Sequence, residues 1–159
     1  MSDAKRDNNR VPAILAVSNV DGETPVVLWA SPSTHRLLAD WALMPATSGG
    51  LTTYRNIDLD ETGILVSTGA HQVYGWYLFN GALTTRYIKF YNKATAPTVG
   101  TDTPVMTIPI PAGSAANVEY NVGIASFPLG LGIGATTAVA DNSTAAPSAN
   151  DCIVNIFYY

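Results

Sequence analysis

The stretch RYIKFYNK (Arg86–Lys93) decides the fold class, together with TPVMTIPIPAG (Thr103–Gly113) shortly after it. In the first stretch, large apolar or aromatic residues alternate with basic or polar ones, and this period of two predicts a β-strand. Ile88 and Phe90 share one face with Arg86, whereas the other face pairs tyrosines with lysines. Because both faces are amphiphilic, the sequence does not show which of them belongs to the core.

The second stretch also has the composition of a strand, but Pro109 lies inside it. Proline has no N–H to donate to a neighbouring strand, so it is confined to sheet edges or bulges. We therefore expect this strand at the edge of its sheet or at a bulge.

Further short strands are expected from about residue 54 to the end of the sequence, separated by turn residues such as Asn80-Gly81 and Pro111-Ala112-Gly113. The expected strands are 54–59, 63–68, 72–80, 85–92, 105–110, 118–122, 124–127, 134–140 and 152–159. No helical period of any length interrupts them. This pattern predicts an all-β domain over residues 51–159, an antiparallel β-sandwich of jelly-roll-like form.

Residues 1–50 have a different texture and predict an extended N-terminal arm that ends in a linker. Two apolar runs, Ala13–Val17 and Val26–Ala30, flank a turn signal at Asp21-Gly22. An isolated hairpin is marginal in water, so such an arm becomes stable by lying on another surface. The apolar residues expected to anchor it are Val11, Ile14, Leu15, Val17, Val26, Leu28, Trp29, Leu37 and Leu38.

The composition excludes some partners and favours others. The chain has 159 residues, a net charge of −4 and only 13% charged residues, and every Lys and Arg lies before residue 94. A surface without a basic face does not suit nucleic acid, whereas a surface poor in charge favours contact with other subunits. No apolar run approaches the roughly 20 residues of a membrane span, and no signal peptide is apparent. We expect a protein that is made in a cytosol and not exported from it.

Possible metal sites are poorly supported. Asp58–Gly63 resembles the first half of a calcium loop, but Gly69 stands where the loop needs a bidentate glutamate. His35 and His71 are the only histidines, and neither has neighbours with zinc-ligand spacing. We expect no metal, and we expect the acidic loop to be a solvated turn.

Catalytic and cofactor motifs are equally weak. The sequence contains no G-x-S-x-G elbow that would mark a nucleophilic serine. A triad of Ser67 or Ser126 with a histidine could form only if the fold brought the residues together. Gly130–Gly134 has the spacing G-x-G-x-G, whereas a dinucleotide-binding loop has the spacing G-x-G-x-x-G. These glycines therefore predict a bulge or a tight bend in a strand. The single cysteine, Cys152, lies in a strand and predicts a buried, inert thiol. We expect no catalytic residue and no cofactor, so the protein is not expected to be an enzyme.

Aromatic residues are the remaining signal. Trp76-Tyr77-Leu78-Phe79 and Phe157-Tyr158-Tyr159 place rings on both faces of their strands. The favoured interpretation is core on one face and a subunit interface on the other. A surface that contacts carbohydrate or protein is the alternative.

The segment DNNRVPAILAVSNVDGETPVVLWASPSTHRLL (Asp7–Leu38) resembles a short N-terminal module of tailed-bacteriophage structural proteins. Its marks are the R-V-P start, the D-G-x-T-P turn and the T-H-R-L-L close. The C-terminal part is similar to another recurrent phage virion domain, through RYIKFYNKATAPTVGTDTPVMTIPIPAG, GIASFPLGLGIGATTAVAD and the final VNIFYY.

This resemblance implies a virion protein whose N-terminal arm docks on the major capsid protein or on another virion protein. It implies a capsid decoration or cement protein, with a homotrimer as the natural symmetric form. The alternative is a neck or tail fibre, an adhesin whose sandwich binds a host surface glycan or protein. The resemblance does not choose between capsid, neck and tail as the position on the particle.

Overall fold

The computed structural model describes residues 15–17, 25–27, 50–120 and 122–159. The chain divides into two compact units, 1–42 and 43–159. In the first unit, β1 (Leu15–Val17) pairs antiparallel with β2 (Pro25–Val27) in a two-stranded sheet of their own. This pairing agrees with the two apolar runs predicted on either side of the turn.

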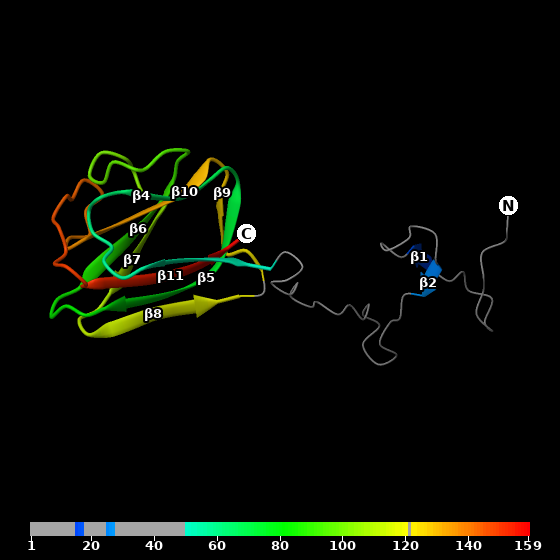
Figure 1. The fold of residues 1–159 in the computed structure, drawn as a ribbon, viewed down its shortest axis with the longest axis horizontal. Helices are drawn as coiled ribbons and strands as arrows, with labels where there is room; N and C mark the ends of the chain where they lie inside the picture. Colours follow the sequence, from blue (N-terminus) through cyan, green and yellow to red (C-terminus); the bar gives the residue numbers. More distant parts are fainter. Residues whose placement is uncertain (1–14, 18–24, 28–49, 121) are drawn as a thin grey trace. The chain divides into compact units, whose positions relative to one another are not determined.

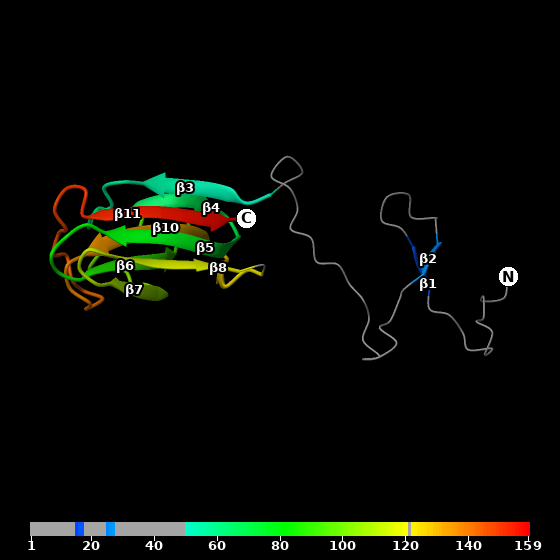
Figure 2. The same ribbon diagram turned by 90° about the horizontal axis from the view of Figure 1, so that it is seen from below.

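The second unit contains two antiparallel sheets packed as a β-sandwich, so the predicted fold class is confirmed at this level (Figure 1). One sheet has the order β3 (Thr52–Asn56), β11 (Cys152–Tyr158), β5 (His71–Asn80), β8 (Ser114–Glu119), with β9 (Ala125–Phe127) paired to the start of β5. The other has the order β4 (Ile64–Thr68), β10 (Gly130–Thr136), β6 (Arg86–Asn92), β7 (Met106–Ile110). Figure 2 shows β3, β11, β5 and β8 side by side in this order. The described segments contain no helix, and hence none that could cross a membrane.

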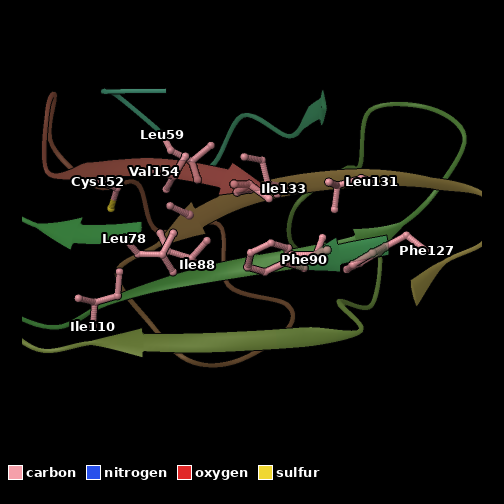
Figure 3. Packing of buried hydrophobic residues seen from close by; sticks show 13 residues of the cluster. Leu59, Leu78, Ile88, Phe90, Ile110, Phe127, Leu131, Ile133, Cys152 and Val154 are labelled. Atoms are coloured by element: carbon pink, nitrogen blue, oxygen red, sulfur yellow. The ribbon is translucent and has the colours of Figure 1, made fainter. Parts of the chain in front are cut away.

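The core lies between the two sheets (Figure 3). Ile88 and Phe90 on β6 face the other sheet and are completely buried. Trp76 on β5 packs against Phe90, with ring centroids 5.7 Å apart. The buried cluster consists of Leu59, Val73, Leu78, Ile88, Phe90, Ile110, Phe127, Leu131, Ile133, Ala135, Cys152, Val154 and Ile156. Each large member contributes about 1.5–3 kcal/mol of hydrophobic stabilisation before ordering costs are subtracted, so this unit has a core of its own.

The structure places three strands earlier in the sequence than predicted. The strand expected at 54–59 is Thr52–Asn56, the strand expected at 118–122 is Ser114–Glu119, and the strand expected at 134–140 is Gly130–Thr136. The glycine-rich stretch is therefore itself a strand, with a register irregularity between Leu131 and Gly132 that agrees with the predicted bulge. Pro109 lies on β7, an edge strand, which confirms its expected position.

The outer face of the four-stranded sheet is covered by the chain's own loops. Lys89 and Tyr91 on β6 point away from the core, yet neither is exposed. A Cβ on Gly134 would approach Val99 of the loop after β6 to 2.6 Å, so this loop lies directly on the sheet. The loop after β10 contributes the Ala140 carbonyl, which accepts a hydrogen bond of 2.6 Å from Lys89 Nζ. Both faces of β6 are therefore buried from Ile88 to Tyr91, one in the core and one beneath loops.

Candidate functional site

The predicted anchoring residues fall mainly outside the part of the chain that the structure describes. Leu15 and Val17 lie on β1 and Val26 lies on β2, where only the backbone pairing is described. The other predicted anchoring residues, Val11, Ile14, Leu28, Trp29, Leu37 and Leu38, are outside the described residues, as is His35. The anchoring role of these residues stays a prediction.

The basic residues of RYIKFYNK serve the fold. Arg86 forms an ion pair with Asp151 at 2.6 Å, and Lys93 forms one with Asp102, also at 2.6 Å. Lys89 donates to backbone carbonyls, and burial lowers the pKa of its ammonium group. The remaining basic residue of the described part is Arg55, which is exposed on β3. Its side chain makes no hydrogen bond or ion pair with another described residue.

The outer face of the five-stranded sheet is uncovered in the described part of the chain. Residues directly opposite one another in the strand pairing form rows across it. One row runs Asn117, Tyr77, Asn155, Arg55, and the next runs Glu119, Gly75, Phe157, Thr53. A third row runs Ala115, Phe79, Ile153. We call these side chains the open face.

The centre of the open face is aromatic. Tyr77 is 43% exposed and Phe79 is 42% exposed, which is high for large apolar side chains. Tyr77 and Phe157 meet edge to face, with ring centroids 5.1 Å apart. This geometry fixes both rings and presents them to solvent as a continuous apolar strip.

The charges on the open face lie at its two edges. Arg55 is on the edge strand β3, and Glu119 is on the edge strand β8. The Tyr77 hydroxyl donates a hydrogen bond of 2.8 Å to Glu119 Oε2, and this bond to the carboxylate raises the pKa of Tyr77. The carboxylate is thereby held against the sheet.

A second candidate site is a pocket of about 390 Å³ at the start of β5. Its lining contains no Asp, Glu, Lys or Arg and consists of Ala70, His71, Gln72, Tyr74, Ser126 and Tyr159. The Tyr74 hydroxyl lies 3.4 Å from Gln72 Oε1, and Tyr159 is 64% exposed. Rings beside amide and hydroxyl groups can bind a polyhydroxylated ligand through both apolar and hydrogen-bonding contacts.

His71 is the first residue of β5, one position before the expected start of this strand at residue 72. Its Nε2 lies 2.9 Å from the Thr68 carbonyl oxygen, which can only accept, so Nε2 carries the hydrogen. The edge of its ring faces Tyr158 at 5.2 Å between centroids. Ser126 lines the same pocket, whereas Ser67 lies on β4, and the structure records no hydrogen bond between His71 and either serine among the described residues.

The remaining sequence candidates have structural roles. Asp60 Oδ1 accepts the backbone N–H of Thr62, and Asp58 Oδ1 accepts that of Asn150, so these carboxylates hold the loop together. Within the described residues no group of three His, Cys, Asp or Glu side chains could hold a metal ion. Cys152 is buried, as predicted, and burial raises the pKa of its thiol to about 12, which disfavours the reactive thiolate.

Arg55 and Glu119 were not predicted as site residues from the sequence, and neither were Gln72 and Tyr74. Their signal is the strand register, which sets residues of four separate strands in one row and is not readable before the pairing is known. Comparison of the chain with protein-family models, curated proteins and solved structures finds no match.

Proposed function

We propose that the chain is a non-enzymatic structural protein of a tailed-bacteriophage virion, a capsid decoration or cement protein anchored by residues 1–50. One observation supports the proposal in addition to the resemblance. The strands from β3 to β11 enclose a complete core, while β1 and β2 form a separate two-stranded sheet. This division suits an anchor joined to a self-sufficient body.

The strand order also supports a jelly-roll-like sandwich. Consecutive strands alternate between the two sheets except at β6–β7 and β8–β9, and the two layers read β3-β11-β5-β8 and β4-β10-β6-β7. This order supports an eight-stranded jelly roll, with β9 as an addition. Jelly rolls are common in viral capsid proteins and in lectins, so the topology fits both a capsid decoration protein and a glycan-binding adhesin.

The proposed mechanism is burial of the arm against the major capsid protein or another virion protein. Each apolar anchor such as Leu28 or Trp29 contributes about 1.5–3 kcal/mol when fully buried, before ordering costs are subtracted. Linking several arms in one homotrimer makes the later binding events intramolecular, which strengthens attachment without new kinds of contact.

The test is sedimentation with particles that are assembled from the encoding phage genome but lack this chain. The full chain should bind these particles, and Leu28→Asp should weaken binding at least ~10-fold through the loss of one buried anchor. Leu83→Asp is the matched control, because Leu83 is 95% exposed on the sandwich. Equal binding by the wild type, Leu28→Asp and Leu83→Asp would refute the proposal that the arm anchors the protein.

The pocket at the start of β5 favours a second candidate function, an adhesin that binds a host surface glycan. Its lining offers Tyr74 and Tyr159 for stacking and Gln72 for hydrogen bonds. The full chain should then bind defined glycans on an array, and Gln72→Ala should abolish that binding while leaving the melting temperature unchanged. Absence of binding to any glycan on the array and to susceptible cells would exclude this function.

A further inference from the structure

We propose that the open face of the five-stranded sheet binds further copies of this chain around a three-fold axis, with Arg55 of one copy paired to Glu119 of the next. The inference rests on the homotrimer of the proposed function and deepens it by naming its interface. The interface can be tested on the purified chain without any particle, so the pairing can fail while attachment to particles stands.

The two outer faces of the sandwich differ in what covers them. The four-stranded sheet is covered by the chain's own loops, which bury even Lys89 and Tyr91 completely. Among the described residues nothing comparable lies over the five-stranded sheet, where Tyr77 and Phe79 are more than two-fifths exposed. A sandwich that covers one sheet so thoroughly and leaves aromatic rings on the other has a face suited to a partner.

The composition of the open face is that of a protein interface. Its centre holds Tyr77, Phe79, Ile153 and Phe157, neighbours in adjacent rows of β5 and β11. Aromatic residues are enriched, and charged residues depleted, at the centres of protein interfaces. The positions around these four are small or uncharged and polar, namely Ala115, Asn117, Asn155 and Thr53, which leaves the centre accessible.

The charges at the edges identify the partner as another copy of the chain. The open face has one cation, Arg55, at its β3 edge and one anion, Glu119, at its β8 edge. In a ring around an axis roughly parallel to the strands, the β3 edge of each copy meets the β8 edge of the next. Every corner then brings opposite charges together, whereas like charges at both edges would oppose closure.

The register also agrees with this pairing. Arg55 shares a row with Tyr77, and Glu119 lies in the adjacent row, two residues further along. The offset along the strand is therefore about 7 Å, a distance that two long side chains can bridge. Glu119 accepts the Tyr77 hydroxyl through Oε2, which leaves Oε1 available to a guanidinium group from outside.

Thiol cross-linking tests the arrangement directly in the full-length protein. Between neighbouring copies, residues 55 and 119 are offset by about 7 Å along the strands, so their Cα atoms lie too far apart for a disulfide. Within one copy the two positions are separated by three strand spacings, about 14 Å. Arg55→Cys/Glu119→Cys protein treated with a short bis-maleimide, whose reach lies between these two distances, should therefore run as a covalent trimer on a denaturing gel. Variants with only one of the two substitutions should not form the trimer. A double variant that stays monomeric after the same treatment would overturn the proposal.

Charge reversal gives an independent measurement without new covalent bonds. Native mass spectrometry of the full chain should show trimers whose dissociation constant rises at least ~10-fold in Arg55→Glu and in Glu119→Arg. The double reversal should restore it, and Leu83→Asp should leave it unchanged. Circular dichroism melting of every variant separates loss of assembly from loss of folding. A monomeric wild type, or a double variant no better than the singles, contradicts the pairing, and a dimer contradicts the three-fold axis.

Discussion

Arg86 on β6 and Asp151 just before β11 join the two layers of the sandwich through a largely buried ion pair. Asp151 Oδ2 accepts hydrogen bonds from Arg86 Nη2 at 2.6 Å and from Arg86 Nε at 2.9 Å. The Arg86 side chain is 10% exposed and the Asp151 side chain is 14% exposed. The same oxygen accepts the backbone N–H of Ser148 at 2.9 Å. One carboxylate thus connects a strand of each sheet with the loop that precedes β11.

Asp151→Asn should destabilise the protein because it removes the charge opposite Arg86. The expected loss in the free energy of unfolding is about 1–2 kcal/mol, measured by urea denaturation. Asp102→Asn is the comparison, since the ion pair of Asp102 with Lys93 is more exposed, at 24% and 35%. A loss for Asp102→Asn equal to that for Asp151→Asn would show that burial of the first pair is unimportant.

The Arg86–Asp151 ion pair also predicts how the free energy of unfolding depends on pH. The hydrogen bond from Arg86 holds the pKa of Asp151 below its usual value, so the folded state binds this proton less readily than the unfolded state does. Its stabilisation is present above the unfolded pKa of about 4 and is lost as pH falls through the lower folded pKa. The difference in unfolding free energy between wild type and Asp151→Asn should shrink from pH 5 to pH 2. A constant difference would contradict this linkage.

Some of this fold could be predicted from local sequence rules. Pro109 indicates an edge strand because its missing N–H is a property of the residue itself. The alternation in Arg86–Lys93 also indicates a strand, because a period of two is a property of the local sequence. Neither signal reports what covers the strand, so the burial of Lys89 beneath the Ala140 carbonyl could not be foreseen. That contact joins residues about fifty positions apart and depends on tertiary structure.

The displaced strand boundaries have a similar cause. Gly130 and Gly132 have low strand propensity, and local rules therefore place the start of this strand later, at residue 134. The structure requires glycine at positions 132 and 134 because Pro97 packs directly over the first and Val99 over the second. β8 was missed at its start because Ala115 and Ala116 carry no β-branched signal. The open face could not be derived at all without the pairing of its strands.

Tyr91→Phe should stabilise the protein. The Tyr91 hydroxyl is buried and has no hydrogen-bond partner among the described residues, so its removal should raise the free energy of unfolding by about 1 kcal/mol. Burial raises the pKa of Tyr91 to about 12, from an unfolded value near 10. Between pH 10 and 12 the unfolded state therefore releases this proton more readily than the folded state, so the free energy of unfolding of the wild type falls as pH rises from about 10 to 12. The variant should lose less stability than wild type in that window, and a lower stability at pH 7 would contradict the role assigned to the hydroxyl.

Gly63→Ala should be strongly destabilising, because its Cβ would collide with the backbone carbonyl of Pro97. Backbone on both sides of the contact cannot move without lifting the loop from the sheet, so a loss of about 1–3 kcal/mol is expected. Gly81→Ala is the matched control, since its new Cβ would meet nothing closer than 3.5 Å. Thermal melting of the two variants should therefore differ by several degrees. Similar melting temperatures would show that the loop is not seated on the sheet.

The Cys152 thiol should report global unfolding. It lies on β11, between β3 and β5, where it is fully buried and its pKa is raised to about 12. A thiol-specific reagent at pH 8 should therefore react only through molecules that have opened, at a rate set by the stability of the core. Asp151→Asn should accelerate labelling by about tenfold for each 1.4 kcal/mol of stability lost. Rapid labelling of the native wild type would instead mean that the end of β11 opens locally, and in that case the acceleration would not follow the unfolding free energy measured in urea.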